Sequence, residues 1–277
     1  MAHAVPHPVR LRLTLAFEGT HYAGWQHQAS GVAVQEVVEK ALAQLFPSRP
    51  RLQGSSRTDS GVHALGLVAH CDVPRTEFRF PAAKLLLALN AHLPEDIRVL
   101  AARRVPVGFH ARFDARGKQY RYLVWNHPAA NPLQRHLTWH VPRQLNLAAI
   151  RDAARVFLGT HDFRAFTANR GVPLDDAVRT LTRCDVQRRG PLLTFVIEGN
   201  GFLYKMCRAI VGTLVQLGLG RLTAADLERI LASRDRRTAG MTAPAHGLVL
   251  WQVHYARGKR NTARPAAVPD ARRPART

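Results

Sequence analysis

The feature that most constrains this chain is a polar turn between apolar segments, QGSSRTDSGVHALG at residues 53–66. Glycine and serine recur in it, and they let the backbone bend tightly and come close to a bound molecule. Leu52 precedes the turn and apolar residues from Leu65 to Val68 follow it, as in buried strands. Asp59 at the centre either caps the local backbone or presents its carboxylate to a ligand.

The charge balance predicts a polyanionic partner. Forty Lys and Arg residues stand against 19 Asp and Glu residues, which gives a formal net charge of +21 and an isoelectric point of about 11.4. Counterion release and long-range steering make such a chain a binder of nucleic acid, although a GC-rich genome alone would account for part of the excess. A membrane surface fits less well, because the sequence has no apolar run of transmembrane length and no basic amphipathic helix.

The cysteines and the N-terminal sequence predict a cytoplasmic protein. Cys71, Cys184 and Cys207 are far apart and lack Cys-x-x-Cys spacing, so we expect isolated thiols in a reducing compartment and no metal site. His63 and His70 have no second pair at ligand spacing, so we expect them to be hydrogen-bonded or solvent-facing. The N-terminus lacks the apolar core of a signal peptide.

Periodicity predicts an α+β fold. Period-two patterns indicate strands at residues 9–17, 64–73, 97–105, 119–125, 178–188 and 192–198. Helical patterns follow at residues 34–46, 82–93, 145–159, 199–218 and 223–233, with Asn200 and Thr223 as expected N-caps. Residues 160–171 are expected to form a loop. The aromatic loop at residues 18–28 is either anchored on the core or stacks on RNA bases.

Strands and helices follow the same order in both halves, which suggests two related lobes. We place them at residues 9–108, which include the Asp59 turn, and 109–257. Residues 1–8 are expected to be a flexible N-terminus. Residues 258–277 form a Pro/Ala/Arg-rich basic tail without a hydrophobic face, and this composition predicts disorder.

Arg208 is the second candidate site residue. It lies in a segment whose apolar residues occupy almost every helical direction, which predicts a buried helix. A buried guanidinium needs a paired anion, because burying an unpaired charge is costly. Its partner is either a local acid or Asp59 across a cleft, unless Arg208 occupies an exposed gap near a helix end.

Tyrosines and basic residues alternate after residue 109. Tyr120 and Tyr122 fall on one face of the predicted strand, a stripe found in cores as well as in binding sites. Basic side chains interleave with them: Arg112, Arg116, Lys118 and Arg121. Arg57 lies two residues before Asp59. If the partner is a nucleic acid, we expect Arg57 to hold either a phosphate or a nucleotide that has left the base stack.

Four separated motifs resemble those of the TruA family of tRNA pseudouridine synthases, and the resemblance spans residues 9–255. They are SRTDSGVHA at residues 56–64, FHARF with KQYRY at 109–122, FLYKMCRAIVGTL at 202–214 and APAHGLVL at 243–250. Many members have Gly where Ser56 stands, and valine is the expected residue at Cys207. The resemblance implies two ferredoxin-like lobes whose sheets join into one continuous, mainly antiparallel sheet, flanked by helices, with a central catalytic cleft.

The resemblance also implies roles for individual residues. Asp59 would be the nucleophile and Arg208 its ion-pair partner, while Tyr120 would stack on the target base and Leu248 would pack beside it. The implied reaction converts uridine to pseudouridine at positions 38, 39 and 40 of the tRNA anticodon stem-loop, by a homodimer and without a cofactor.

Two alternatives remain open at this point. They are a related pseudouridine synthase with other RNA sites and a non-catalytic RNA-binding protein on the same scaffold. A glycoside hydrolase is disfavoured, because the motif offers no second acid near Asp59.

Overall fold

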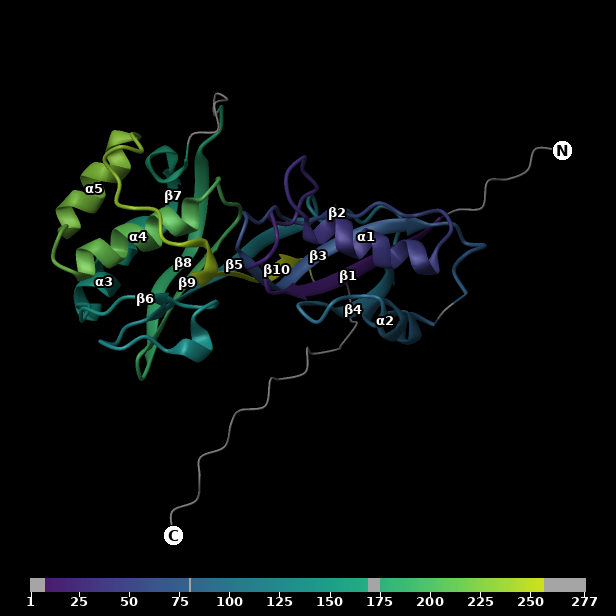
Figure 1. Ribbon diagram of the computed structural model, residues 1–277. Helices are drawn as coiled ribbons and strands as arrows, with labels where there is room; N and C mark the ends of the chain where they lie inside the picture. The colour runs from purple at the N-terminus through teal and green to yellow at the C-terminus, as the bar shows by residue number, and fades with distance from the viewer. Residues whose placement is uncertain (1–7, 80, 169–174, 257–277) are drawn as a thin grey trace, which may run out of the picture.

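A computed structural model describes residues 8–79, 81–168 and 175–256 of the chain, and Figure 1 shows an elongated molecule in which helices pack on a long sheet. The strands are β1 (Val9–Phe17), β2 (Gln53–Gly54), β3 (His63–Val73), β4 (Ile97–Val105), β5 (Ala115–Trp125), β6 (Trp139–His140), β7 (Gly159–Asp162), β8 (Val178–Arg189), β9 (Leu192–Gly199) and β10 (Leu248–Tyr255). The α-helices are α1 (Val34–Leu45), α2 (Ala82–Ala91), α3 (Leu147–Ala154), α4 (Met206–Gly218) and α5 (Ala224–Ser233).

The strands of the described residues form one sheet in the order β4-β1-β3-β10-β5-β9-β8-β7, with β2 paired to β3 and β6 to β5. The pairing is antiparallel except where β10 meets β3 and β5 meets β6. The predicted α+β fold with a mainly antiparallel sheet flanked by helices is therefore confirmed.

β1 shows why the sequence adopts this sheet. Leu11, Leu13 and Leu15 are fully buried, and the residues between them are only partly so. Alternate side chains of a strand point to opposite faces, so one face of β1 joins the core. α1 and α2 lie on this half of the molecule (Figure 1), and α1 buries Val34 and Val38.

α4 is the buried helix of the other half. Its apolar side chains are buried on all sides, as the sequence predicted, and it packs against α3. Gly212 is required in it, because an added Cβ would lie 1.8 Å from the carbonyl oxygen of Met241. The backbone of the segment before β10 therefore lies directly against this helix.

β10 joins the two halves of the sheet. Val249 and Leu250 pair in parallel with the start of β3, while Leu248 lies opposite Tyr122 of β5. The last strand of the described chain is thus a central strand, with the first half on one side and the second on the other. The lobe boundary at residues 108 and 109 remains a prediction.

Three local predictions were wrong. α4 begins at Met206, after Lys205 in a left-handed conformation (φ 58°), and Asn200 instead accepts a hydrogen bond from the backbone N–H of Thr180. α3 ends at Ala154 rather than at residue 159. Residues 159–162 form β7, because they pair with the edge of β8.

The ends of the chain lie largely outside the described residues. This applies to the predicted flexible N-terminus, apart from Pro8, and to the predicted basic tail at residues 258–277. In the part of the chain that is described, no helix is both long and apolar enough to cross a membrane.

Candidate active site

The Asp59 turn, residues 55–62, is held tightly at the start of β3. The backbone N–H of Ser55 donates to the carbonyl of Val68 (2.7 Å), and the N–H of Val68 donates to Ser55 Oγ (3.2 Å). The N–H of Val62 closes a turn on the carbonyl of Asp59 (3.1 Å), with Gly61 at φ 75°. Glycine adopts this left-handed conformation at little cost, so the carboxylate is fixed at the tip of a rigid turn.

The aromatic loop at residues 18–28 supports this turn from one side. The N–H of Trp25 donates to the carbonyl of Thr58 (3.2 Å), and Ser60 Oγ donates to the carbonyl of Tyr22 (3.2 Å). Tyr22 and Trp25 are only 9% and 2% exposed. The loop is therefore anchored on the core, and the alternative that these two rings stack on RNA bases was wrong.

His63 connects the Asp59 turn to the segment before β10. Its Nδ1 accepts the N–H of Gly19 (2.9 Å), so Nε2 carries the proton and donates to the carbonyl of His246 (2.9 Å). Burial lowers the pKa of His63 and keeps this ring neutral. The predicted hydrogen-bonded state is confirmed for His63 and also for His70, which accepts the N–H of Ala111.

Arg208 lies against Asp59. Its Nη1 is 3.4 Å from Asp59 Oδ2, and its Nε donates to the carbonyl of Ala243 (2.8 Å). The two side chains are 13% and 23% exposed, respectively. The hydrogen bond to Ala243 fixes the guanidinium, so the cation faces the carboxylate in a site with little water.

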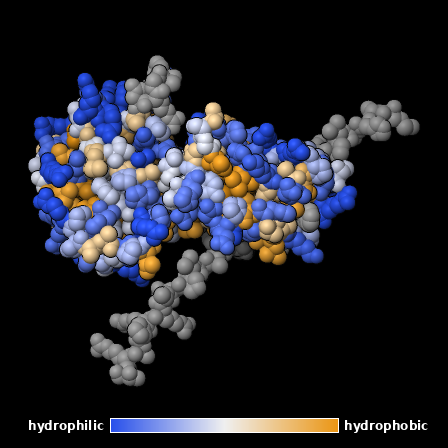
Figure 2. Space-filling model, viewed as in Figure 1, coloured by the Kyte–Doolittle hydropathy of each residue, from blue (hydrophilic) through white to orange (hydrophobic). Residues whose placement is uncertain are grey.

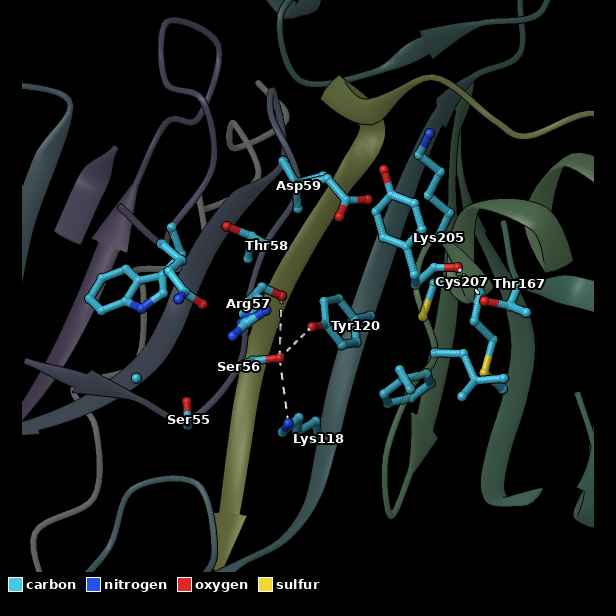
Figure 3. A pocket seen from close by; sticks show the side chains of 18 of the residues that line it. Ser55, Ser56, Arg57, Thr58, Asp59, Lys118, Tyr120, Thr167, Lys205 and Cys207 are labelled. Atoms are coloured by element: carbon cyan, nitrogen blue, oxygen red, sulfur yellow. Dashed lines mark hydrogen bonds between the residues drawn. The ribbon is translucent and has the colours of Figure 1, made fainter. Parts of the chain in front are cut away.

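A cleft of about 1000 Å³ opens beside Asp59. Asp59, Arg57, Tyr120 and Leu248 all line it, and Figure 3 shows the first three among the side chains around the cavity. Tyr120 is 6% exposed, its ring meets Phe202 edge to face (5.0 Å between centroids), and burial raises its pKa. The structure thus brings these four residues to one cavity.

Arg57 and Leu248 occupy different parts of this cleft. Arg57 is exposed on the Asp59 turn, whereas Leu248 is 6% exposed at the first position of β10. Leu248 therefore presents a fixed apolar surface, and Arg57 presents a cation that can reach a ligand in solvent.

Cations dominate the lining of the cleft. The basic residues that line it are Arg57, Arg112, Lys118, Arg164, Lys205, Arg234 and Arg236, and the acidic ones are Asp59 and Asp235. Asp235 is already bonded through both carboxylate oxygens to Arg237. Hydrophilic residues cover most of the face seen in Figure 2. The arrangement suits a polyanion of nucleotide size or larger.

Comparisons with known proteins agree with this geometry. A family model described as tRNA pseudouridine synthase matches residues 14–114 and 153–256. A protein of Acetivibrio thermocellus named tRNA pseudouridine synthase A is 43% identical over 245 residues, which cover 88% of this chain and 99% of the relative. The protein of that name from Geobacillus kaustophilus is 42% identical over 89% of this chain and 94% of its own. The chain belongs to the tRNA pseudouridine synthase family.

This member of the tRNA pseudouridine synthase family has two site residues that sequence reasoning missed. Lys118 Nζ donates to Ser56 Oγ (3.4 Å), and Ser56 Oγ lies 3.1 Å from the Tyr120 hydroxyl. Strand alternation could have identified Lys118, because residues two apart share a face and Tyr120 faces the cleft. No such signal existed for Ser56, whose contacts join the Asp59 turn to a distant strand.

Proposed function

We propose that this enzyme converts uridine to pseudouridine at positions 38, 39 and 40 of the tRNA anticodon stem-loop. The observation that carries the proposal is the Asp59 carboxylate, which lies against Arg208 and lines a cationic cleft. The relatives named tRNA pseudouridine synthase A support the same reaction class and substrate. The anticodon-arm positions rest on the resemblance of the four motifs.

The reaction needs a nucleophile and a route for one proton. The C1′–N1 bond breaks, the uracil turns, C5 bonds to C1′, the C5 hydrogen leaves as a proton, and N1 gains a proton. We assign the nucleophile to Asp59, which attacks either the sugar or the base. Arg208 balances and aims its charge. No electrons or atoms are gained, so no cofactor is required.

The target uridine must leave the stack to reach Asp59, because the turn lies inside a cleft. The cavity of about 1000 Å³ can receive an extruded nucleotide. We assign Tyr120 to stacking on the flipped base, Leu248 to apolar contact beside it and Arg57 to a phosphate or the extruded state. The remaining cations bind the RNA backbone and read its shape rather than its sequence.

We further propose a cytoplasmic homodimer. Three buried free cysteines suit a reducing compartment. Leu133 is 90% exposed beside a second cavity of about 500 Å³ lined by Trp125, Pro132 and Trp139, which gives a second copy an apolar surface to cover. Light scattering is expected to report a dimer, and Leu133→Glu is expected to weaken it.

Chemical mapping of pseudouridine tests the main proposal. Purified enzyme is incubated with tRNA transcripts that carry uridine at position 38, 39 or 40 only, beside transcripts without any of the three. Product confined to the first set supports the proposal. Product elsewhere would indicate a related synthase with other sites, and tight binding without product would indicate a non-catalytic RNA-binding protein.

A further inference from the structure

The Ser56 side chain connects the Asp59 turn to β5. Its hydroxyl contacts Lys118 Nζ at 3.4 Å and the Tyr120 hydroxyl at 3.1 Å, and Figure 3 shows it between the two. Lys118 and Tyr120 are two residues apart on β5 and share the face that lines the cleft. Three groups that exchange protons therefore form a continuous chain with the phenol beside the proposed base site.

The groups around this chain suit proton transfer away from the substrate. Burial, and with it the charges of Arg112 and Arg179, lowers the pKa of Lys118 to about 8. A substantial fraction of the amine is then neutral near physiological pH and can accept a proton. Burial, Cys207 and Asp59 all disfavour a phenolate at Tyr120, so its hydroxyl must pass a proton on as it receives one.

We propose that Lys118 receives the proton that leaves uracil C5, relayed through the hydroxyls of Tyr120 and Ser56. This proton transfer rests on the proposed function. It is compatible with attack of Asp59 on the sugar and with attack on the base. It occurs after the C5–C1′ bond has formed.

The proton moves along the relay in three transfers. The C5–H bond breaks, its electron pair moves through the ring to N1, and N1 takes a proton from solvent. The Tyr120 oxygen takes the C5 proton while its own passes to Ser56 Oγ, and the Ser56 proton passes to Lys118 Nζ. The resulting ammonium later releases its proton to solvent.

The test compares single-turnover rates of pseudouridine formation with tRNA carrying hydrogen or deuterium at uridine C5. Ser56→Ala and Lys118→Met break the relay, whereas Ser56→Thr keeps the hydroxyl. Arg116→Met removes an exposed cation from the same strand and serves as the control for charge. General acid–base catalysis contributes roughly 10²–10⁴-fold, and alternative acceptors such as water recover part of it, so we expect losses of about 10- to 100-fold.

Three outcomes support the relay together. The slowed reactions of Ser56→Ala and Lys118→Met show a primary C5-deuterium isotope effect. Ser56→Thr recovers most of the rate that Ser56→Ala loses, and Arg116→Met stays within about threefold of the parent. The parent rate rises with pH and levels above about pH 8, because the neutral amine is the acceptor. This rise is absent from Lys118→Met.

Other outcomes overturn it. Slowed variants without an isotope effect, or a Lys118→Met profile that keeps the pH rise, exclude Lys118 as the proton acceptor. A loss confined to tRNA affinity and its salt dependence assigns Lys118 to a phosphate instead. Parent activity together with an inactive Asp59→Asn shows that the proposed function stands, so failure of the relay is separable from failure of the function.

Discussion

Arg208 and Asp59 are 149 residues apart in the sequence, and Arg208 Nη1 lies 3.4 Å from Asp59 Oδ2. One residue lies on the most buried helix and the other on a polar turn between strands. The hydrogen bond from Arg208 Nε to the carbonyl of Ala243 fixes the guanidinium, so its position does not depend on the carboxylate. The cation therefore acts as a fixed support for Asp59.

Arg208→Met is expected to reduce the single-turnover rate by roughly 10²-fold, because the carboxylate loses the group that aims it. Arg208→Lys keeps the charge but loses the planar fork that contacts both Asp59 and Ala243. Its single-turnover rate should therefore lie between those of the parent and Arg208→Met. The comparison requires circular dichroism and thermal melts of each variant, since this helix is buried. A parent-like rate for folded Arg208→Met would contradict the assignment.

Asp59→Asn is expected to abolish isomerisation while tRNA affinity stays within about threefold of the parent, since the amide is nearly isosteric but is not a nucleophile. Release of tritium from C5-labelled uridine in tRNA measures the reaction, and filter binding measures affinity. Asp152→Asn, the same change at a carboxylate that is 74% exposed on α3 and lies outside the cleft, is the control. Turnover within about tenfold of the parent would exclude Asp59 as the nucleophile.

Two substitutions at Tyr120 separate the role of its ring from that of its hydroxyl. Tyr120→Phe keeps the ring and its edge-to-face contact with Phe202, so binding should survive while the rate falls with the loss of the hydroxyl bonded to Ser56. Tyr120→Leu also removes the stacking surface, worth roughly 1–3 kcal/mol per base. Equilibrium binding and single-turnover rates of both variants make the test. Equal tRNA affinity of Tyr120→Phe and Tyr120→Leu would argue against stacking of the Tyr120 ring on the base.

His63 predicts a pH dependence of stability. Its folded-state pKa lies below the ordinary 6.5, so below about pH 6.5 the unfolded chain binds more protons and the free energy of unfolding falls with falling pH. His70 and His246 are shifted in the same direction and add to this slope. Above about pH 6.5 the contribution is fully present and constant.

Urea unfolding between pH 5 and 7.5 measures this slope. His63→Gln removes one of the titrating groups and should flatten the dependence of the free energy of unfolding on pH. The free energy of unfolding of this variant is lower than that of the parent, because two hydrogen bonds change. His92→Gln, at an exposed histidine after α2, should leave the slope as it is in the parent. An unchanged slope in His63→Gln would mean that another group controls acid sensitivity.

Local signals predicted local structure well. The alternation from Val9 to Phe17 gave β1 with both ends correct, and Thr223 forms the expected cap with Asp226 in a capping box. The position of the Asp59 turn followed from small polar residues between apolar ones. In each case the determining interactions lie within a few residues of one another.

The failures involve contacts across the fold. The FLYK sequence at residues 202–205 is compatible with a helix, yet it forms a wall of the cleft and Lys205 turns into the left-handed region before α4. Nothing near Ser56 in the sequence indicates that β5 passes beside it. The burial of Tyr22 and Trp25 likewise depends on elements that are distant in the chain.

The place of β10 affects how the protein is made. The ribosome delivers the Asp59 turn early and the strand that unites both halves near the end, so a nascent chain carries the carboxylate long before Leu248 closes the cleft. Until then β3 and β5 each have an edge that is covered only in part, by the two-residue strands β2 and β6, and such edges recruit strands from other chains. We therefore expect translation that stops before Leu248 to yield a fragment prone to aggregation, because β10 is the strand that unites the two halves of the described sheet.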